Sequence, residues 1–245
     1  MLIRQEPDGS FLAIGQASHA WLSGQLARAW GNDEFGAVEP WEEVCLGAEQ
    51  HDVGWTVWDL EPTFNPGTGL PHTFIDLALD EKLTLWSGAA KKVLAQSRYA
   101  SLLVSMHGTA LYERWPPEDP ADRRMAERFI ESEKAFQEQI LRTGLDRDAV
   151  RRNQRLVFAW DYNSLALCLD WAPADVKDVP TVDGPVTLAL SEDGTLDPWP
   201  FSDKRISVRV EGRRLPGRFE DEQSLREALS AAEWVTLDFE LRARG

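Results

Sequence analysis

Cysteine is scarce in this 245-residue sequence, because Cys45 and Cys168 are its only two and they form no CxxC pair. This excludes a disulfide framework and a thiolate zinc finger, and it is typical of a protein in a reducing cytoplasm. Long apolar runs are also missing, and the N-terminal stretch MLIRQEPDGS lacks the basic start and apolar centre of a signal peptide. We therefore predict a cytoplasmic protein with no membrane partner.

Basic residues are outnumbered, since 26 Lys and Arg stand against 41 Asp and Glu and give a net charge of −15. Phosphate backbones repel such a chain, so we exclude a nucleic-acid polymer as its partner. The sequence also lacks a GxxxxGK[ST] loop, a GxGxxG turn after a strand and a GxSxG elbow. These absences exclude the common nucleotide-binding loops and the serine-hydrolase nucleophile.

The apolar spacing is helical through most of the first 171 residues. A short hairpin is predicted before it, around the turn signal Pro7-Asp8-Gly9, and an irregular segment over 55–79, where prolines and glycines cluster. The last helix is expected to begin after Asp146 as its N-cap. The predicted helices cover residues 16–30, 40–54, 80–96, 99–113, 120–142 and 147–171.

After Pro173 the apolar period changes to two, which is typical of strands. The spacing predicts a small antiparallel sheet with one helix, serving as a lid, a wall or a dimer surface, and a homo-oligomer is left open. We predict a mainly α fold, a helical bundle with a short N-terminal hairpin and a small C-terminal β region. The predicted domains are 1–173, which holds any chemistry, and 174–245, which packs on the first.

The candidate functional residues are histidines and one aspartate of the helical region. Three histidines lie on the apolar stripe of a predicted helix, although a single inward histidine is more often a core residue than a ligand. Asp161 lies between Val157 and Leu165, each one helical turn away. A buried carboxylate needs a cation or several donors, and one metal ion would satisfy it together with inward imidazoles. The three histidines are His19, His51 and His107.

The run Ala48-Glu49-Gln50-His51-Asp52-Val53-Gly54 resembles the central motif of the HD-domain superfamily, in which the adjacent His and Asp close a helix and bind a metal ion. In that superfamily an upstream helix supplies a His and a downstream helix supplies an Asp. His19 in QASHAWLSGQLARAW and Asp161 in FAWDYNSLALCL fit these positions. The chain is also similar to an uncharacterised bacterial family, domain of unknown function 3891. The HD resemblance covers residues 10–171.

The resemblance implies an HD-like helical bundle that holds one or two divalent ions of Mn, Fe, Mg, Ni or Zn. Binuclear members insert further histidines between the HD pair and the last Asp. The catalytic candidates are Asp52 and His107, the latter as a ligand of a second ion or as a general acid. The implied ligands are His19, His51, Asp52 and Asp161, followed by His107 and His72.

The sequence departs from the superfamily in two places. Many of its phosphohydrolases carry a Lys or Arg shortly after the HD-G turn, where this chain has Trp55-Thr56-Val57-Trp58-Asp59. Arg151, Arg152 and Arg155 could supply charge, but they equally form an ordinary solvated face. His72 lies beside Pro71 in the irregular segment, so a surface position is an equal alternative to a ligand role.

The remaining candidates lie near the ligands in sequence. Gln16 and Gln154 fall on the same helical faces as His19 and Asp161, and we expect them to orient ligands or to hydrogen-bond each other. Three tryptophans are candidates for stacking on an aromatic or nucleotide-like small-molecule substrate, and core packing is the alternative. They are Trp55, Trp58 and Trp160.

Three functions are compatible with these residues. The first is a metal-dependent hydrolase of HD type, in which a metal-bound water cleaves a phosphoester. The second is a di-iron oxygenase, as some HD relatives are, and the missing basic residue and the many tryptophans agree with it equally well. The third is a non-catalytic module that binds a small molecule or a structural metal. Metal content separates the three.

Overall fold

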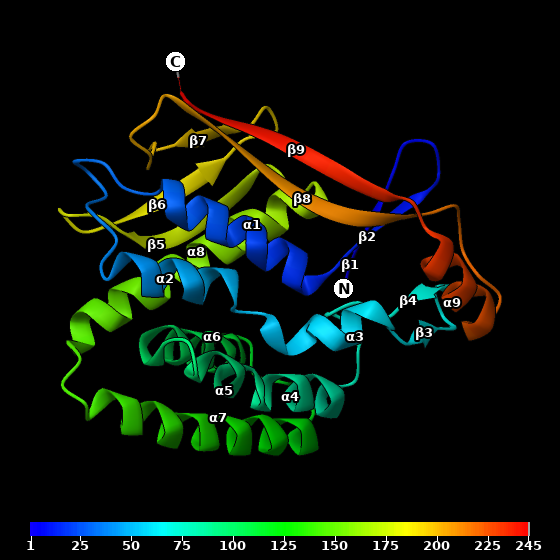
Figure 1. Cartoon of the computed structure of the whole chain (residues 1–245), viewed down its shortest axis with the longest axis horizontal. Coiled ribbons are helices and arrows are strands. Elements are labelled where there is room, and N and C mark those ends of the chain that lie inside the picture. The colour runs from blue at the N-terminus through cyan, green and yellow to red at the C-terminus, as the bar shows by residue number, and fades with distance from the viewer. Residues whose placement is uncertain (245) are drawn as a thin grey trace.

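The N-terminal residues form the predicted hairpin. Its strands, β1 (Leu2–Gln5) and β2 (Phe11–Ile14), pair antiparallel across a turn at Gly9. The computed structural model describes residues 1–244 of the chain and shows a layer of helices packed beneath a long, curled sheet (Figure 1).

Helices occupy most of the chain between residues 16 and 169. The last of them begins as predicted, because the Asp146 carboxylate accepts hydrogen bonds from the backbone N–H groups of Asp148 and Ala149. The helices are α1 (Gln16–Ala29), α2 (Trp41–Glu49), α3 (Thr56–Leu60), α4 (Leu79–Ser87), α5 (Ala89–Leu94), α6 (Arg98–Arg114), α7 (Pro120–Leu141) and α8 (Arg147–Leu169), with a 3-10 turn at Val53–Trp55.

Two helices differ from their predicted bounds. The helix predicted over 40–54 ends at Glu49, so His51 and Asp52 lie in the turn that follows it. The helix predicted over 80–96 is divided into α4 and α5 at Gly88. In both places the chain turns between two packed helices. Apolar periodicity indicates that a segment is helical but does not show where a helix breaks to let the next one pack.

The prediction of a mainly α bundle with a small β appendage is wrong. Helices account for 48% of the chain and strands for 21%, and within residues 1–244 seven strands form one curled sheet in the order β1-β2-β8-β9-β7-β6-β5 (Figure 1). Its strands after α8 are β5 (Ala174–Pro180), β6 (Pro185–Leu190), β7 (Thr195–Asp197), β8 (Arg205–Leu215) and β9 (Trp234–Ala243), and α9 (Glu222–Ala231) lies between the last two in sequence. The short strands β3 (Phe64–Asn65) and β4 (Leu70–Pro71) pair with each other in a separate sheet.

The error has a physical cause in strand pairing. Phe11 of β2 pairs with Leu215 of β8, so the N-terminal hairpin forms one edge of the large sheet. Pairing between segments so far apart in sequence leaves no mark on local periodicity. The division into 1–173 and 174–245 stays a prediction, and strands from both parts pair in this sheet.

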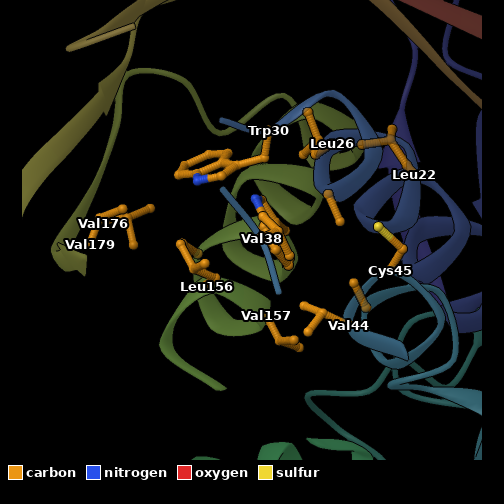
Figure 2. Close-up of a cluster of buried hydrophobic side chains, with 14 of the residues drawn as sticks. Leu22, Leu26, Trp30, Val38, Val44, Cys45, Leu156, Val157, Val176 and Val179 are labelled. Atoms are coloured by element: carbon orange, nitrogen blue, oxygen red, sulfur yellow. The ribbon is translucent and has the colours of Figure 1, made fainter. Parts of the chain in front are cut away.

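The main core lies where α1 and α8 meet the sheet. Trp30 at the end of α1 packs near Val176 and Val179 of β5 and Leu156 of α8 (Figure 2). Its ring meets that of Trp160 edge to face, with centroids 5.6 Å apart. Burying these side chains fixes α1 and α8 side by side, and these two helices carry His19 and Asp161. In the part of the chain that the structure describes, no helix is both long and apolar enough to cross a bilayer.

Candidate metal centre

Donors from four parts of the helical layer converge at one buried point. His19 comes from α1, His51 and Asp52 from the turn after α2, Asp161 from α8 and His107 from α6, and all five side chains are buried. One nitrogen each of His19 and His51 and one oxygen of Asp161 lie within 4.8 Å of one another. The structure thus brings these side chains together, and their role as metal ligands stays a prediction.

Close packing of α1 on α2 brings the two imidazoles together. A Cβ at Gly24 of α1 would lie 2.8 Å from the Cβ of Glu49 at the end of α2, so only glycine permits this approach. The rings of His19 and His51 meet edge to face with centroids 5.1 Å apart. The Arg28 guanidinium pairs with the Glu49 carboxylate across the same helix pair.

The tautomer of His51 follows from its hydrogen bond. Its Nδ1 lies 2.8 Å from the backbone carbonyl of Ala48, which can only accept, so Nδ1 carries the proton. Its Nε2 lies 3.3 Å from Asp161 Oδ1 and 3.6 Å from Asp52 Oδ2 and has no hydrogen-bond partner. A buried ring nitrogen beside two carboxylate oxygens is an arrangement that a proton or a metal cation satisfies.

A pair of serines holds His19 in the same tautomer. Ser164 Oγ donates to the Asp161 backbone carbonyl at 2.8 Å, and it lies 2.9 Å from His19 Nδ1. Because the Ser164 hydrogen is used in that bond, Nδ1 is the donor to Ser164 Oγ. Ser23 Oγ donates a hydrogen bond to Ser164 Oγ at 2.9 Å and so holds the Ser164 hydroxyl in place. His19 Nε2 then faces Asp52 Oδ2 at 2.7 Å, a contact that requires a proton or a metal ion.

Neighbouring charges set the protonation of this cluster. Burial alone would lower the pKa of His51, but the charges of Asp52 and Asp161 outweigh it and raise the pKa to about 9. Burial alone would raise the pKa of Asp161, but the three imidazoles around it lower the pKa to about 2. The carboxylate is therefore ionised at neutral pH and retains its affinity for a cation.

His107 lies at the rim of the cluster. Its Nε2 is 3.7 Å from Asp161 Oδ2, its ring centroid is 4.6 Å from that of His51, and its Nδ1 is buried without a partner. Burial, with the charge of His51, lowers the pKa of His107 to about 4. Its ring is therefore neutral at pH 7 and available as a ligand or as a proton acceptor.

A pocket of about 480 Å³ opens on the cluster, and we call it the aromatic pocket. Its walls are mostly rings, and Lys82 of α4 is its one Lys or Arg among the residues that the structure describes. The Lys82 ammonium donates to the Ile75 carbonyl at 3.0 Å. The pocket is lined by Gln16, His19, Asp52, Trp55, Phe74, Ile75, Lys82, Trp86, His107, Leu111, Tyr112, Trp115, Phe158, Asp161, Tyr162, Leu165 and Trp171.

The family described as "Protein of unknown function (DUF3891)" matches residues 1–217. The chain belongs to this family. The matched span contains every donor of the cluster and all of β8, whereas α9 and β9 lie beyond it. No curated protein and no solved structure matches the chain significantly. The predicted similarity to family 3891 is thereby confirmed, whereas membership of the HD-domain superfamily stays a prediction.

Of the other predicted residues of this DUF3891 chain, two lie at the aromatic pocket. Gln16 lines it one helical turn before His19, with its Oε1 buried and unpartnered. Trp55 also lines it. Trp58 meets Trp55 edge to face at 5.6 Å, and its own ring packs against the apolar cluster around Met1 and Leu70.

Three predicted residues lie elsewhere. Trp160 is fully buried in the core, because adjacent residues on a helix point about 100° apart and Asp161 takes the direction of the pocket. Gln154 shares a face with Asp161 but lies two turns away, about 10 Å along α8, and lines a different surface pocket. His72 pairs with the Thr63 hydroxyl at 2.9 Å and does not line the aromatic pocket.

Sequence reasoning missed Lys82, Ser164 and Tyr112. Lys82 and Trp86 are four residues apart within a predicted helix, and both line the aromatic pocket. Ser164 follows Asp161 by three residues on α8, which places both on one side of the helix. Helical spacing therefore held a signal for these residues, but nothing in the sequence indicated which helix faces would meet.

We expect the metal-free protein to be most stable near pH 6.5. Folded His51 keeps its proton up to a pKa of about 9, so its stabilisation is complete below 6.5 and is lost as pH rises through 9. His107 has the opposite sign, because its folded pKa of about 4 lies below 6.5, and stability is lost as pH falls between these values. Urea unfolding with a chelator present measures both slopes.

The variant His51→Gln serves as the control for this pH profile. It removes the group that titrates near pH 9, so the alkaline decline should disappear. An unchanged alkaline slope in His51→Gln would assign that decline to another group.

Proposed function

We propose that this protein is a divalent-metal-dependent hydrolase that cleaves a phosphoester of a small aromatic molecule. The observation that carries the proposal is the convergence of His19 and His51, each with Nδ1 engaged as a donor, on the carboxylates of Asp52 and Asp161. Two imidazole nitrogens and two carboxylates are a common donor set for Mn, Fe or Zn.

We also propose a distant relation to the HD-domain superfamily. The order of donors along the chain supports it, with a His on α1, the His-Asp pair after α2 and an Asp on α8. The proposal concerns this ligand set and the helices that carry it.

His19, His51, Asp52 and Asp161 are the residues that would hold the ion. When bound, a divalent ion supplies a water molecule of lowered pKa and polarises a phosphoryl oxygen. The serines at positions 23 and 164 fix the ring of His19, and the Ala48 carbonyl fixes that of His51, so that neither ring rotates.

His107 is suited to accept a proton or to bind a second ion. Its low pKa keeps it neutral at pH 7, and its unpartnered Nδ1 leaves one nitrogen free for either role. A general acid would need to hold a proton at neutral pH, so the structure supports the ligand and acceptor roles better.

Lys82 supplies the positive charge that is missing after the HD-G turn. It reaches the aromatic pocket from α4, some thirty residues after His51, and desolvation lowers its pKa. An ammonium held by the Ile75 carbonyl would attract a phosphate group that enters the pocket. Trp86, Tyr112 and the other rings would stack on an aromatic substituent and exclude water.

Metal analysis of the full-length protein, purified without chelator, tests the proposal. We expect one or two Mn, Fe, Mg, Ni or Zn ions per chain and hydrolysis of an aromatic phosphoester such as 4-nitrophenyl phosphate or its bis ester. Two irons with a visible charge-transfer band and no hydrolysis would favour the oxygenase instead. No bound metal and no stability loss on adding EDTA would contradict the proposal and favour a binding module.

A further inference from the structure

A second pocket, with a volume of about 340 Å³, is lined by residues of α6, α8 and β5. We call it the cationic pocket, because Arg114, Arg155 and Lys177 line it together with Gln154. It shares the Phe158 side chain with the aromatic pocket, so the two pockets meet at one ring. The cations come from the end of α6, from α8 and from β5.

Among the described residues, the three cations of this pocket outnumber its one free carboxylate, that of Asp178. Within residues 1–244 none of them forms an ion pair. Two carboxylates also line the pocket, but that of Glu113 is paired with Lys134 at 2.5 Å. Unpaired cations gathered around one hollow are unusual in a chain with a net charge of −15, because its many carboxylates offer partners.

Arg114 is oriented by aromatic rings rather than by a carboxylate. Its guanidinium lies 4.9 Å from the centroid of Phe158 and 5.2 Å from that of Trp115. Stacking of this kind fixes the plane of the guanidinium and leaves its N–H groups free. Those donors are suited to bind a phosphate group at the boundary of the two pockets.

An irregularity in β5 accounts for the position of Lys177 in the cationic pocket. The register between β5 and β6 shifts between Val176 and Val179, and Asp178 has a φ of +60°. Consecutive strand residues normally point to opposite faces, yet Lys177 and Asp178 both line the cationic pocket. Bulges redirect side chains in this way and are frequent beside functional sites.

We propose that the cationic pocket binds a phosphate group of the ligand whose ring lies in the aromatic pocket. The phosphate contacts Arg114, Arg155 and Lys177, and the apolar part of the ligand crosses Phe158. The phosphate site stands on the cationic pocket alone, whereas the placement of the ring rests on the proposed function. The ligand class is then an aromatic compound with a phosphate distant from the group that reacts at the metal centre.

Binding of inorganic phosphate to the full chain, followed by ³¹P NMR line broadening at low salt, tests the anion site. We expect Arg155→Gln to weaken binding about fivefold, because one charge-assisted contact is lost. Asp178→Asn should tighten binding by a similar factor of about five, since it removes the unpaired negative charge and Asn tolerates a positive φ. Arg151→Gln on the same helix, outside the pocket, should leave binding within about twofold.

Repeating the titrations in His51→Ala separates this site from the metal centre. Phosphate binding that persists there and still responds to Arg155→Gln supports the cationic pocket, even if the protein binds no metal. Binding lost in His51→Ala but unchanged in Arg155→Gln and Asp178→Asn would overturn it. For the ring, phenylphosphonate should bind more tightly than phosphate, and equal affinity would overturn the shared-ligand proposal.

Discussion

Asp161→Asn is expected to abolish metal binding and hydrolysis while the protein remains folded. The substitution keeps the volume of the side chain but removes a buried negative charge that lies 3.3 Å from His51 Nε2. Loss of a residue that merely supports a ligand costs about 10- to 100-fold in metal affinity, so loss of a ligand should cost more than about 100-fold. Metal content after gel filtration, with circular dichroism to confirm folding, is the measurement.

Asp170→Asn is the matched control. It makes the same charge change at the end of the same helix, where the φ of +57° is as open to Asn as to Asp. It should retain wild-type metal content. Full metal stoichiometry and unchanged affinity in Asp161→Asn would show that the convergence of donors has another purpose, such as a protonated structural network. A change in stability alone would not decide between the two, since a network would also be weakened.

Gly54→Ala is expected to destabilise the fold by about 3 kcal/mol or more. A Cβ at this position would overlap the backbone carbonyl oxygen of Leu85 in α4, and neither the 3-10 turn nor the helix can yield without moving the other. His51 and Asp52 directly precede this 3-10 turn, so metal affinity should fall as well. Urea unfolding with and without added metal measures both effects.

Gly88→Ala provides the comparison for Gly54→Ala. Gly88 has a φ of −104°, and a Cβ there would meet no atom within 4 Å. Its stability should change by less than about 0.5 kcal/mol, or rise slightly because the unfolded chain loses entropy. Equal stability of the two variants would mean that α4 does not pack tightly against the 3-10 turn that contains Gly54.

The candidate donors could be predicted because each leaves a local signal. Asp161 between Val157 and Leu165 indicates a carboxylate on a buried helical face, and burial of a charge implies a partner. The partners of His19 could not be predicted in the same way. Ser164 supports its ring only because α1 and α8 lie side by side; its spacing from Asp161 indicates a helix face but not that His19 lies opposite.

The fold class was predicted wrongly, although most helices were located. Helical periodicity located α6, α7 and α8 closely, but the hairpin and the C-terminal strands were taken as separate pieces. The pairing of Phe11 with Leu215 depends on shape and burial across the whole chain, and local alternation is the same whichever strand lies alongside. Gln154 is a second example. Helical spacing correctly put it on the same face of α8 as Asp161, but it did not show that Gln154 lines a different pocket.

By itself the sequence determined which residues lie on the buried face of a helix or strand, because apolar residues recur with the helix and strand repeats. It also showed which residues on those faces are polar or charged. That was enough to name His19, His51, His107 and Asp161, whereas Asp52 was named through the resemblance to the HD motif. Only the tertiary structure decided that Lys82 and the rings of α6 and α8 form one pocket, and that β1 joins a sheet with β9. Contacts between distant segments depend on the total packing of the chain, and local sequence does not encode them.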